Sequence, residues 1–349
     1  ALANGTGAAS NYSLNSTVIN VTQRPISLSG TRLYDATTNA VASDLSTHAN
    51  LVGSQTLSLS GTGSVANANV GNNKTVTVGT LALGNGSNGG LAGNYTLSGG
   101  THQLTVNQRP LNATLARQYD GTTAAAGSTV SSFDALQGGE TLTMTGSGTA
   151  ASANVANGIA MSSNGNLALA NGTGAASNYS LNSTVINIAK RVLNSSGSKT
   201  YDANTNALAG VITLSNLVSG EALNHSGTAT ISSANAGSYT ISNLSGISIA
   251  DGSGGAASNY TLTGGTHNFT INRRVVSVQG NKTYDGNTTI SAGNITSVTG
   301  TVGSQTLVIS GGNGTVSSAN VATYSSSAIN EGTLTLGNGA NGGLASNYT

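Results

Sequence analysis

The chain of 349 residues has no cysteine and no tryptophan, only two prolines, and only 6% charged residues with a formal net charge of +1. Without cysteine there can be no disulfide framework and no thiolate metal site, so stability must come from packing. The near-zero charge leaves no basic surface for nucleic acid. No apolar run approaches the length of about 20 residues that a membrane helix needs, so we expect no membrane span in this region.

The sequence is instead rich in glycine, with 49 residues, and in serine, threonine, asparagine and alanine. Val, Ile, Leu and Thr recur in alternating segments, and the net charge is low, so a folded chain is expected rather than a disordered one. A nearly uncharged protein also lacks the usual protection against self-association, so we expect it to associate with itself or to be modified on its surface.

One unit is repeated along the chain, because residues 1–20 and 168–187 have the same sequence. Two markers recur with a period of about 83 residues, which is far longer than a solenoid turn. The first marker is Asn-Tyr followed by Ser or Thr, with its tyrosines at Tyr12, Tyr95, Tyr179, Tyr260 and Tyr348. The second is Tyr-Asp followed by Gly or Ala, at Tyr34 and Asp35, Tyr119 and Asp120, Tyr201 and Asp202, and Tyr284 and Asp285.

These markers divide the chain into repeats. Residues 1–24 form the C-terminal part of a preceding repeat, and complete repeats follow at 25–109, 110–191 and 192–274. The last repeat, 275–349, lacks the closing strands. Two explanations fit these ends: either the chain is a window from a longer array, which we favour, or subunits join head to tail by donating the missing strands.

Short segments inside each repeat alternate with a period of two, as half-buried strands do, for example Leu57 with Leu59 and Leu104 with Val106. Clusters of Gly, Asn, Ser and Asp connect them and favour tight turns. We therefore predict an all-β protein, a tandem array of small antiparallel β-sandwich-like domains. A β-solenoid is the alternative, but it needs a shorter repeat inside each unit.

The repeats are joined without a flexible spacer. The segment 105–115 passes directly from one repeat into the next, as do 185–194 and 270–278. Such junctions have few free torsions, and a ten-residue strand spans about 33 Å, so a semi-rigid rod is predicted.

The Tyr-Asp motif places a carboxylate beside an aromatic ring in every repeat. A functional role would make the aspartate a ligand for calcium or for a sugar. A calcium site needs several oxygen ligands, and each turn offers one carboxylate. We therefore expect a structural motif: an Asx turn with the tyrosine packed on the sheet.

No catalytic or metal constellation accompanies these motifs. The four histidines, His48, His102, His225 and His267, do not recur in every repeat and are expected to be structural. Glu140 and Glu221 align with Gln55 and Gln305, and a position that accepts either residue does not perform acid–base chemistry. We expect no enzyme activity, no cofactor and no metal.

Five Asn-Tyr-Ser/Thr motifs are also sequons for N-glycosylation, which would solubilise an uncharged surface. The alternative is that the asparagine supplies a turn before the strand. The candidate asparagines are Asn11, Asn94, Asn178, Asn259 and Asn347.

The ordered motifs KTYDGNTT (282–289), GSQTLVISG (303–311), SSANVA (317–322) and LASNYT (344–349) resemble the YDG-type repeats of very large bacterial surface adhesins. Those proteins are similar to filamentous haemagglutinins, many of which use two-partner secretion. The resemblance implies an extracellular location on a bacterial surface and a structural role in attachment, cell–cell adhesion or a biofilm matrix. It implies self-association into a filament and contact with host cells, neighbouring cells or matrix polysaccharide.

Two other functions remain open from the sequence. Faces rich in Thr and Ser, together with tyrosines, are compatible with a glycan-binding module. Outward threonines are also found on ice-binding surfaces, although the turns here look too irregular for a flat array.

Overall fold

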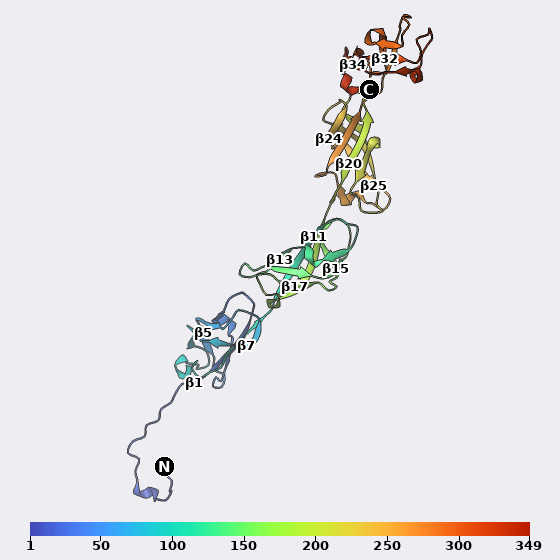
Figure 1. Ribbon diagram of the computed structural model, residues 1–349. Coiled ribbons are helices and arrows are strands. Elements are labelled where there is room, and N and C mark those ends of the chain that lie inside the picture. The colour runs from blue at the N-terminus through green and yellow to red at the C-terminus, as the bar shows by residue number, and fades with distance from the viewer. The chain divides into compact units, whose positions relative to one another are not determined.

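The computed structural model describes all residues from 1 to 349, and its regular structure is almost entirely β (Figure 1). The helices are short 3₁₀ turns of three residues each, and none of them is long and apolar enough to cross a membrane. The strands form several separate sheets, which confirms the predicted tandem β domains and shows no solenoid. The chain divides into two compact units, Ala1–Ala116 with Thr123–Ala151 and Gly158–Asn187, and Arg117–Thr122 with Ser152–Asn157 and Ile188–Thr349.

The first domain, β1 to β10, is built on a six-stranded sheet with the order β3-β6-β7-β10-β2-β4. The pairs β5-β8 and β1-β9 complete it, and Ile26, Leu28, Leu45 and Leu104 lie fully buried in its core. A short helix, η1 (Ala9–Asn11), precedes the domain. Its elements are β1 (Arg24–Pro25), β2 (Ser27–Leu33), β3 (Asn39–Val41), η2 (Ala42–Asp44), β4 (Thr47–Ala49), β5 (Leu57–Ser60), β6 (Thr62–Val65), β7 (Gly71–Thr77), β8 (Ala82–Asn85), η3 (Ala92–Asn94), β9 (Tyr95–Thr96) and β10 (His102–Asn107).

The first and last long strands of this domain are neighbours and run parallel. The register pairs Leu28 with His102 and continues to Leu33 with Asn107. The large sheets of the first and third domains are therefore mixed, with one parallel pair among antiparallel ones, while smaller sheets such as β5-β8 are antiparallel. The physical reason is the tandem array: the chain enters the domain along β2 and leaves along β10, so the two strands must point the same way.

The second domain, β11 to β18, repeats this arrangement with the order β12-β15-β16-β18-β11-β13. A separate pair, β14-β17, lies beside it. Its elements are β11 (Arg109–Gln118), β12 (Ala124–Ala126), η4 (Gly127–Thr129), β13 (Val130–Phe133), β14 (Leu142–Thr145), β15 (Ser147–Ala150), β16 (Ala156–Ser163), β17 (Ala168–Asn171), η5 (Ala176–Asn178) and β18 (Tyr179–Ala189).

The third domain, β19 to β27, again has a central parallel pair, which joins Ser195 to His267 and continues to Thr200 with Asn272. Its sheet has the order β21-β23-β24-β27-β20-β22, and β25 pairs with β23. Its elements are β19 (Arg191–Val192), β20 (Asn194–Thr200), β21 (Asn206–Leu208), η6 (Ala209–Val211), β22 (Ile212–Ser215), β23 (Leu223–Ile231), β24 (Gly237–Asn243), β25 (Ile247–Asp251), η7 (Ala257–Asn259), β26 (Tyr260–Thr261) and β27 (His267–Asn272).

The fourth domain, β28 to β34, has the flanking strands but not the central one. β28 pairs only with β30, and β33 pairs only with β32. In the first and third domains the corresponding strands lie on either side of β10 and β27. Its elements are β28 (Ser277–Gly280), β29 (Thr289–Ser291), η8 (Ala292–Asn294), β30 (Ile295–Thr299), β31 (Leu307–Gly311), β32 (Asn313–Val316), η9 (Ser326–Ala328), β33 (Ile329–Asn330), β34 (Thr335–Asn338) and η10 (Ala345–Asn347).

A glycine on β2 allows close approach of another backbone segment. A Cβ atom at Gly30 would lie 1.7 Å from the carbonyl oxygen of Asp44. Gly197 in the third domain and Gly280 in the fourth have similarly close neighbours, Val211 O at 2.5 Å and Asn294 O at 2.2 Å. Turn chemistry alone therefore does not explain these glycines, because they lie inside strands.

We expect Gly30→Ala to destabilise the first domain by about 1–3 kcal/mol, because the added methyl group must displace the backbone at Asp44. Chemical denaturation followed by circular dichroism measures the change. Gly93→Ala is the matched control, since a Cβ there meets no atom within 4 Å. Equal stability of the two variants would contradict the close contact.

Candidate functional site at the domain junctions

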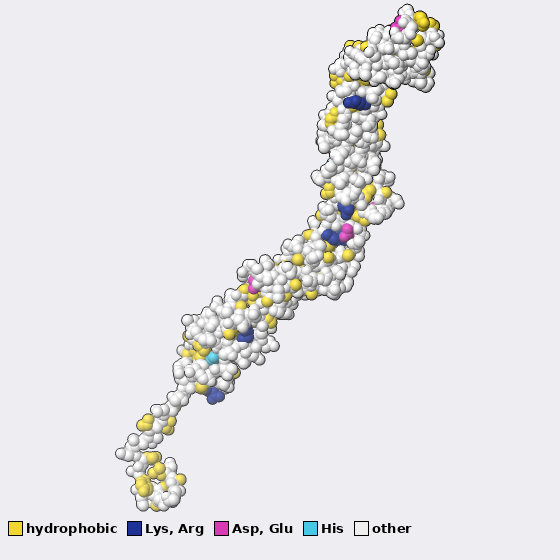
Figure 2. Space-filling view, viewed as in Figure 1, with side chains coloured by type: hydrophobic (Ala, Val, Ile, Leu, Met, Phe, Trp, Pro, Cys, Tyr) yellow, Lys and Arg dark blue, Asp and Glu magenta, His cyan; other side chains and the backbone are white.

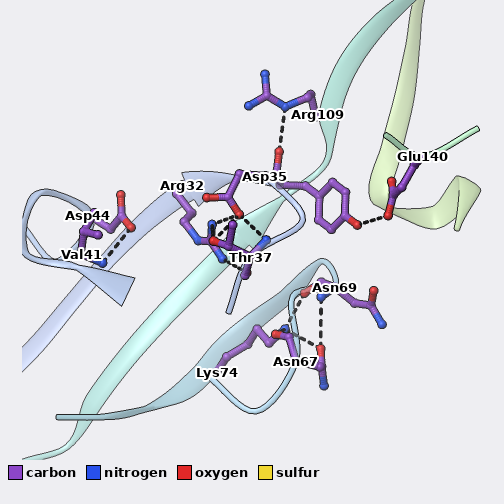
Figure 3. A network of polar contacts seen from close by, with 11 residues as sticks. Arg32, Asp35, Thr37, Val41, Asp44, Asn67, Asn69, Lys74, Arg109 and Glu140 are labelled. Atoms are coloured by element: carbon purple, nitrogen blue, oxygen red, sulfur yellow. Dashed lines mark hydrogen bonds and ion pairs between the residues drawn. The ribbon is translucent and has the colours of Figure 1, made fainter. Parts of the chain in front are cut away.

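The Tyr-Asp motif forms a tight local structure at the end of β2 (Figure 3). The carboxylate of Asp35 accepts a hydrogen bond from the Thr37 amide at 2.9 Å and pairs with the guanidinium of Arg32. Partial burial acts to raise the pKa of Asp35, but the hydrogen bonds from Thr37 and Arg32 outweigh it and hold the pKa below its usual value. The motif is therefore an Asx turn closed by an ion pair.

The same turn occurs in every domain with a cation three residues before the aspartate. Arg117 pairs with Asp120, and the lysines of the third and fourth domains lie 2.8 Å from their aspartates. The corresponding amide hydrogen bonds to the carboxylates come from Thr122, Asn204 and Asn287. No group of three or more acidic or histidine side chains lies close enough together to hold a metal ion.

The turn directs its tyrosine away from its own domain and into the next one. Tyr34 packs edge-to-face against Tyr179, with ring centroids 5.3 Å apart and an interplanar angle of 77°. The two later junctions have the same geometry, with centroids 5.4 Å apart for Tyr119 and Tyr260 and 5.3 Å apart for Tyr201 and Tyr348. The six rings are buried, so each junction is a small aromatic core between two domains.

A single acidic or amide side chain connects both hydroxyl groups of each pair. Tyr34 donates to Glu140 Oε1 and Tyr179 donates to Glu140 Oε2, each at 2.6 Å. Tyr119 and Tyr260 bind the two oxygens of Glu221 in the same way, also at 2.6 Å. Each carboxylate oxygen of Glu140 and Glu221 therefore accepts a hydrogen bond from a buried tyrosine hydroxyl. Hydrogen bonds to a charged acceptor are stronger than those between two neutral groups.

The third junction has a glutamine in place of the glutamate. Its side chain still binds both tyrosine hydroxyls, but it accepts one hydrogen bond and donates the other. Tyr348 donates to Gln305 Oε1, while Gln305 Nε2 donates to the hydroxyl oxygen of Tyr201 at 3.0 Å. A hydroxyl can donate or accept, so the tyrosine pair accommodates either residue. The alternation of Glu and Gln at this position thus preserves a contact between domains.

The asparagine of the Asn-Tyr marker supplies a second contact at each junction. Asn178 accepts the Val70 amide at 3.0 Å and donates to Asn69 Oδ1 at 3.0 Å. Asn259 binds Val155 and Asn154, and Asn347 binds Ala236 and Asn235, in the same manner. The asparagine side chain therefore binds the loop of the preceding domain through both its Oδ1 and its Nδ2 atom.

This contact corrects three of the candidate glycosylation sites. The side chains of Asn178, Asn259 and Asn347 are at most 1% exposed, and a glycan on any of them would prevent the junction from closing. Asn11 and Asn94 are exposed, because no domain of the chain lies against them.

The arginines at the start of the second and third domains contact the backbone of the preceding Tyr-Asp tyrosine. Arg109 Nε donates to the carbonyl oxygen of Tyr34 at 2.7 Å, and Arg191 makes a longer contact of 3.4 Å to that of Tyr119. Beside it, a parallel pairing joins the arginine to the Asn-Tyr tyrosine, as in Arg191 with Tyr260 and Arg274 with Tyr348.

We call the two halves of a junction the exit face and the entry face. The exit face carries the tyrosine of the Tyr-Asp motif and the loop asparagine, for example Tyr34 and Asn69. The entry face carries the Glu or Gln and the Asn-Tyr pair, for example Glu140, Asn178 and Tyr179. Three of the predicted motif tyrosines lie outside any junction. Tyr12 is exposed, Tyr95 is buried in the first domain and donates to Gln55 Oε1, and Tyr284, on the exit face of the fourth domain, is 65% exposed.

The first and second junctions raise the pKa of their tyrosines. Burial is the largest cause for Tyr34, followed by its hydrogen bond to Glu140 and the negative charge of that carboxylate, and together they raise its pKa to about 12. Burial and Glu221 raise the pKa of Tyr260 to about 12 as well. The hydroxyl groups therefore stay protonated and able to donate well above neutral pH.

Three of the histidines form hydrogen bonds within their own domains. His102 accepts the Leu28 amide at 3.2 Å through Nδ1 and contacts the Leu97 carbonyl at 2.8 Å through Nε2. His267 contacts Ser195 and the Leu262 carbonyl in the equivalent place, and His225 contacts two backbone carbonyl oxygens.

Sequence reasoning identified the tyrosines and aspartates but missed their partners. The alignment of Glu140 and Glu221 with Gln305 was used only to exclude acid–base chemistry at this position, and the loop asparagines were not predicted to make contacts. The available signal was the shared shape of Glu and Gln at one position of every repeat. Glu and Gln share a side-chain oxygen that accepts hydrogen bonds but differ in acidity, so a position that accepts either is typical of a hydrogen-bonding role.

Comparison with protein families assigns these repeats. The YDG domain model matches residues 17–105, 102–186 and 189–267, which is more than half of the chain. The chain belongs to the YDG domain family. No curated protein and no solved structure matches it.

We expect Glu140→Ala to destabilise the first junction by about 2 kcal/mol or more, since two buried tyrosine hydroxyls lose their acceptor. Glu140→Gln should cost less than about 1 kcal/mol, because Gln305 performs the same role. Thermal unfolding and amide exchange of the loop around Val70 measure both changes. Equal damage from the two substitutions would contradict the shared-acceptor arrangement.

The raised tyrosine pKa predicts a loss of stability at high pH. Between the usual tyrosine pKa of 10 and the value of about 12 for folded Tyr34, the unfolded chain releases a proton that the folded chain keeps. The free energy of unfolding should therefore fall as pH rises through this window and be independent of this group below it. Tyr34→Phe should reduce the fall, and Tyr12→Phe should leave it unchanged; pH-dependent denaturation distinguishes these outcomes.

Proposed function

We propose that this chain is a structural repeat region of an extracellular bacterial adhesin or filament, in which the domains transmit tension. The observation that carries the proposal is the parallel pairing of the first and last long strands within a domain, combined with a buried junction between successive domains. Together they define an unbroken path for force along the chain.

The parallel pair resists tension because of its direction. A pull on the two ends of the first domain draws β2 toward its start and β10 toward its end, so the strands slide past each other. All hydrogen bonds of the six-residue register between Leu28 and Asn107 are then loaded together. A hairpin pulled at its open end breaks its bonds one at a time, which needs less force.

The junctions suit the same role. Each excludes solvent from two tyrosines and binds them to one side chain, and no Gly/Ser-rich spacer separates the domains. Linkers of that kind leave neighbouring domains free to reorient. The YDG domains of this chain are thus suited to act as a spacer that holds another part of the proposed adhesin away from the cell surface.

The surface favours contact with other surfaces. Figure 2 shows few, scattered charged side chains on the face in view, and only 6% of the residues are charged. Such a surface is poorly protected against association. We propose that the protein belongs to filamentous-haemagglutinin-like adhesins exported by two-partner secretion. Its partners are copies of itself, together with host cells, neighbouring cells or matrix polysaccharide.

Single-molecule force spectroscopy tests the mechanical role, and the absence of cysteine allows attachment points to be chosen freely. The variant Gln23→Cys with Gln108→Cys loads the first domain in shear. The matched variant Gln23→Cys with Thr101→Cys pulls β2 and β10 apart from one end. We expect the shear variant to need a several-fold higher force, and equal forces would contradict the proposal.

Antibody labelling of intact source cells tests the location. The proposal expects label on the cell exterior and reduced attachment or aggregation when the gene is deleted. Label confined to the cell interior would overturn it. Binding of the chain to a glycan array would instead indicate direct recognition by the repeats.

A further inference from the structure

The junction tyrosines are paired in a chain that has few other oxidisable side chains. The sequence has no cysteine, no tryptophan, two methionines and eleven tyrosines. Methionine oxidises to a sulfoxide and forms no link to a second residue. Oxidation of two neighbouring tyrosines, in contrast, can join their rings by a carbon–carbon bond. Six of the eleven tyrosines lie in such pairs, one pair at each junction.

The geometry of each pair brings together the atoms that couple. Tyrosyl radicals couple through Cε, the ring carbon next to the one that bears the hydroxyl. In the first junction the hydroxyls of Tyr34 and Tyr179 each lie 2.6 Å from an oxygen of the same carboxylate, that of Glu140. The ring centroids of this pair are 5.3 Å apart. The Cε atoms beside the two hydroxyls are therefore neighbours as well.

The edge-to-face arrangement has to change before two rings can couple. Rotation of a ring about its Cβ–Cγ bond moves the Cε atoms but leaves the hydroxyl oxygen in place, because that oxygen lies on the rotation axis. Both hydrogen bonds to Glu140 can therefore persist while one ring turns from its interplanar angle of 77°. The shared carboxylate thus keeps the two hydroxyl ends together during the turn.

The shared glutamate also supplies a base for the oxidation. A phenol that loses an electron becomes a strong acid, so the electron leaves more easily when a base already holds the hydroxyl proton. Glu140 and Glu221 accept hydrogen bonds from both tyrosines of their junctions. Gln305 in the third junction is an amide without basic character, and its Nε2 donates to Tyr201. The hydrogen-bonding role is common to all three junctions, but the base is present only in the first two.

Burial limits what a tyrosyl radical at a junction can meet. Tyr34 and Tyr179 are 3% and 2% exposed, and Tyr119 and Tyr260 are 5% and 1% exposed. An electron can leave a buried ring without contact between that ring and the oxidant. Coupling needs contact, and the tyrosine packed against each ring is its partner across the junction. The product should therefore be a link within one chain rather than a link between copies.

We propose that the tyrosine pairs of the first and second junctions, Tyr34 with Tyr179 and Tyr119 with Tyr260, are sites of oxidative cross-linking to dityrosine. Hydrogen peroxide, acting through a haem peroxidase, removes one electron from each ring, and the carboxylate takes up each hydroxyl proton in turn and passes it to water. The two radicals form a Cε–Cε bond, and the hydrogens on those carbons return to the phenol oxygens as protons. In sum, the pair loses two hydrogen atoms and one peroxide is reduced to two water molecules.

The cross-links connect successive domains covalently. Tyr34 belongs to the first domain and Tyr179 to the second, while Tyr119 belongs to the second domain and Tyr260 to the third. A chain without cysteine has no disulfide for this purpose. The inference goes beyond the proposed function and does not depend on it, because coupling can be measured on the isolated chain.

Peptide mapping after oxidation tests the cross-links. The chain carries Tyr12→Phe and Tyr284→Phe, which remove two exposed tyrosines able to couple between copies, and is treated with hydrogen peroxide and a haem peroxidase. Trypsin cleaves after Lys and Arg and releases the two tyrosines of every junction on different peptides. We expect linked peptides that are two hydrogen atoms lighter than the sum of their parts. Their yield at the first and second junctions should be about ten-fold or more above that at the third, which lacks the base.

Two reciprocal variants isolate the role of the carboxylate. Glu140→Gln gives the first junction the side chain of the third and should lower its yield to that of the third, with the second junction as a reference in the same molecule. Gln305→Glu should raise the yield of the third junction to that of the first two, and a gain of this kind cannot come from misfolding. Tyr34→Phe should remove the first link altogether.

Three results would overturn the inference. Absence of linked peptides at the first and second junctions would exclude coupling there. Equal yields at all three junctions, or yields that neither reciprocal variant changes, would show that the carboxylate takes no part. Chains linked to one another on a denaturing gel, without links inside single chains, would show that the radicals react with other copies and not with their partners.

Discussion

The structure depends on one interaction, the sharing of a single Glu or Gln by two tyrosines from successive domains. The Asx turn fixes where the first tyrosine points, the Asn-Tyr pair places the second, and the shared side chain satisfies both hydroxyls where water is excluded. An unpaired hydroxyl in that position would be costly, so the three residues function as a unit. The motif that names the family is in this chain a connector between domains.

The direction of the strands imposes the second constraint. An antiparallel sandwich with neighbouring first and last strands would return the chain to the end where it entered. Here the parallel pair of β2 and β10 brings the chain out at the opposite end, where the Tyr-Asp turn also lies. The same strand order therefore determines both where the chain leaves the domain and where the junction forms.

Local features of this fold were accessible from the sequence, and relations between distant segments were not. The alternation at Leu104 and Val106 predicts a strand with a buried face, and both side chains are buried. The parallel partner of that strand lies more than 70 residues away, and periodicity contains no information about it. Asn178 looked like a glycosylation site because only the preceding domain, which contributes Val70 and Asn69, buries it. The role of Glu140 was missed for the same reason, since one of its two hydrogen-bond donors, Tyr34, belongs to the preceding domain.

The position of β10 in the sheet has a consequence for the order of folding. The last strand of the domain to be synthesised lies between β7 and β2, so the sheet consists of two separate parts until residue 107 is available. A domain that emerges stepwise from a ribosome therefore cannot complete its sheet until its final segment is free. Because the contacts that close the sheet join segments more than 70 residues apart, this closing step comes late and is slow compared with local folding.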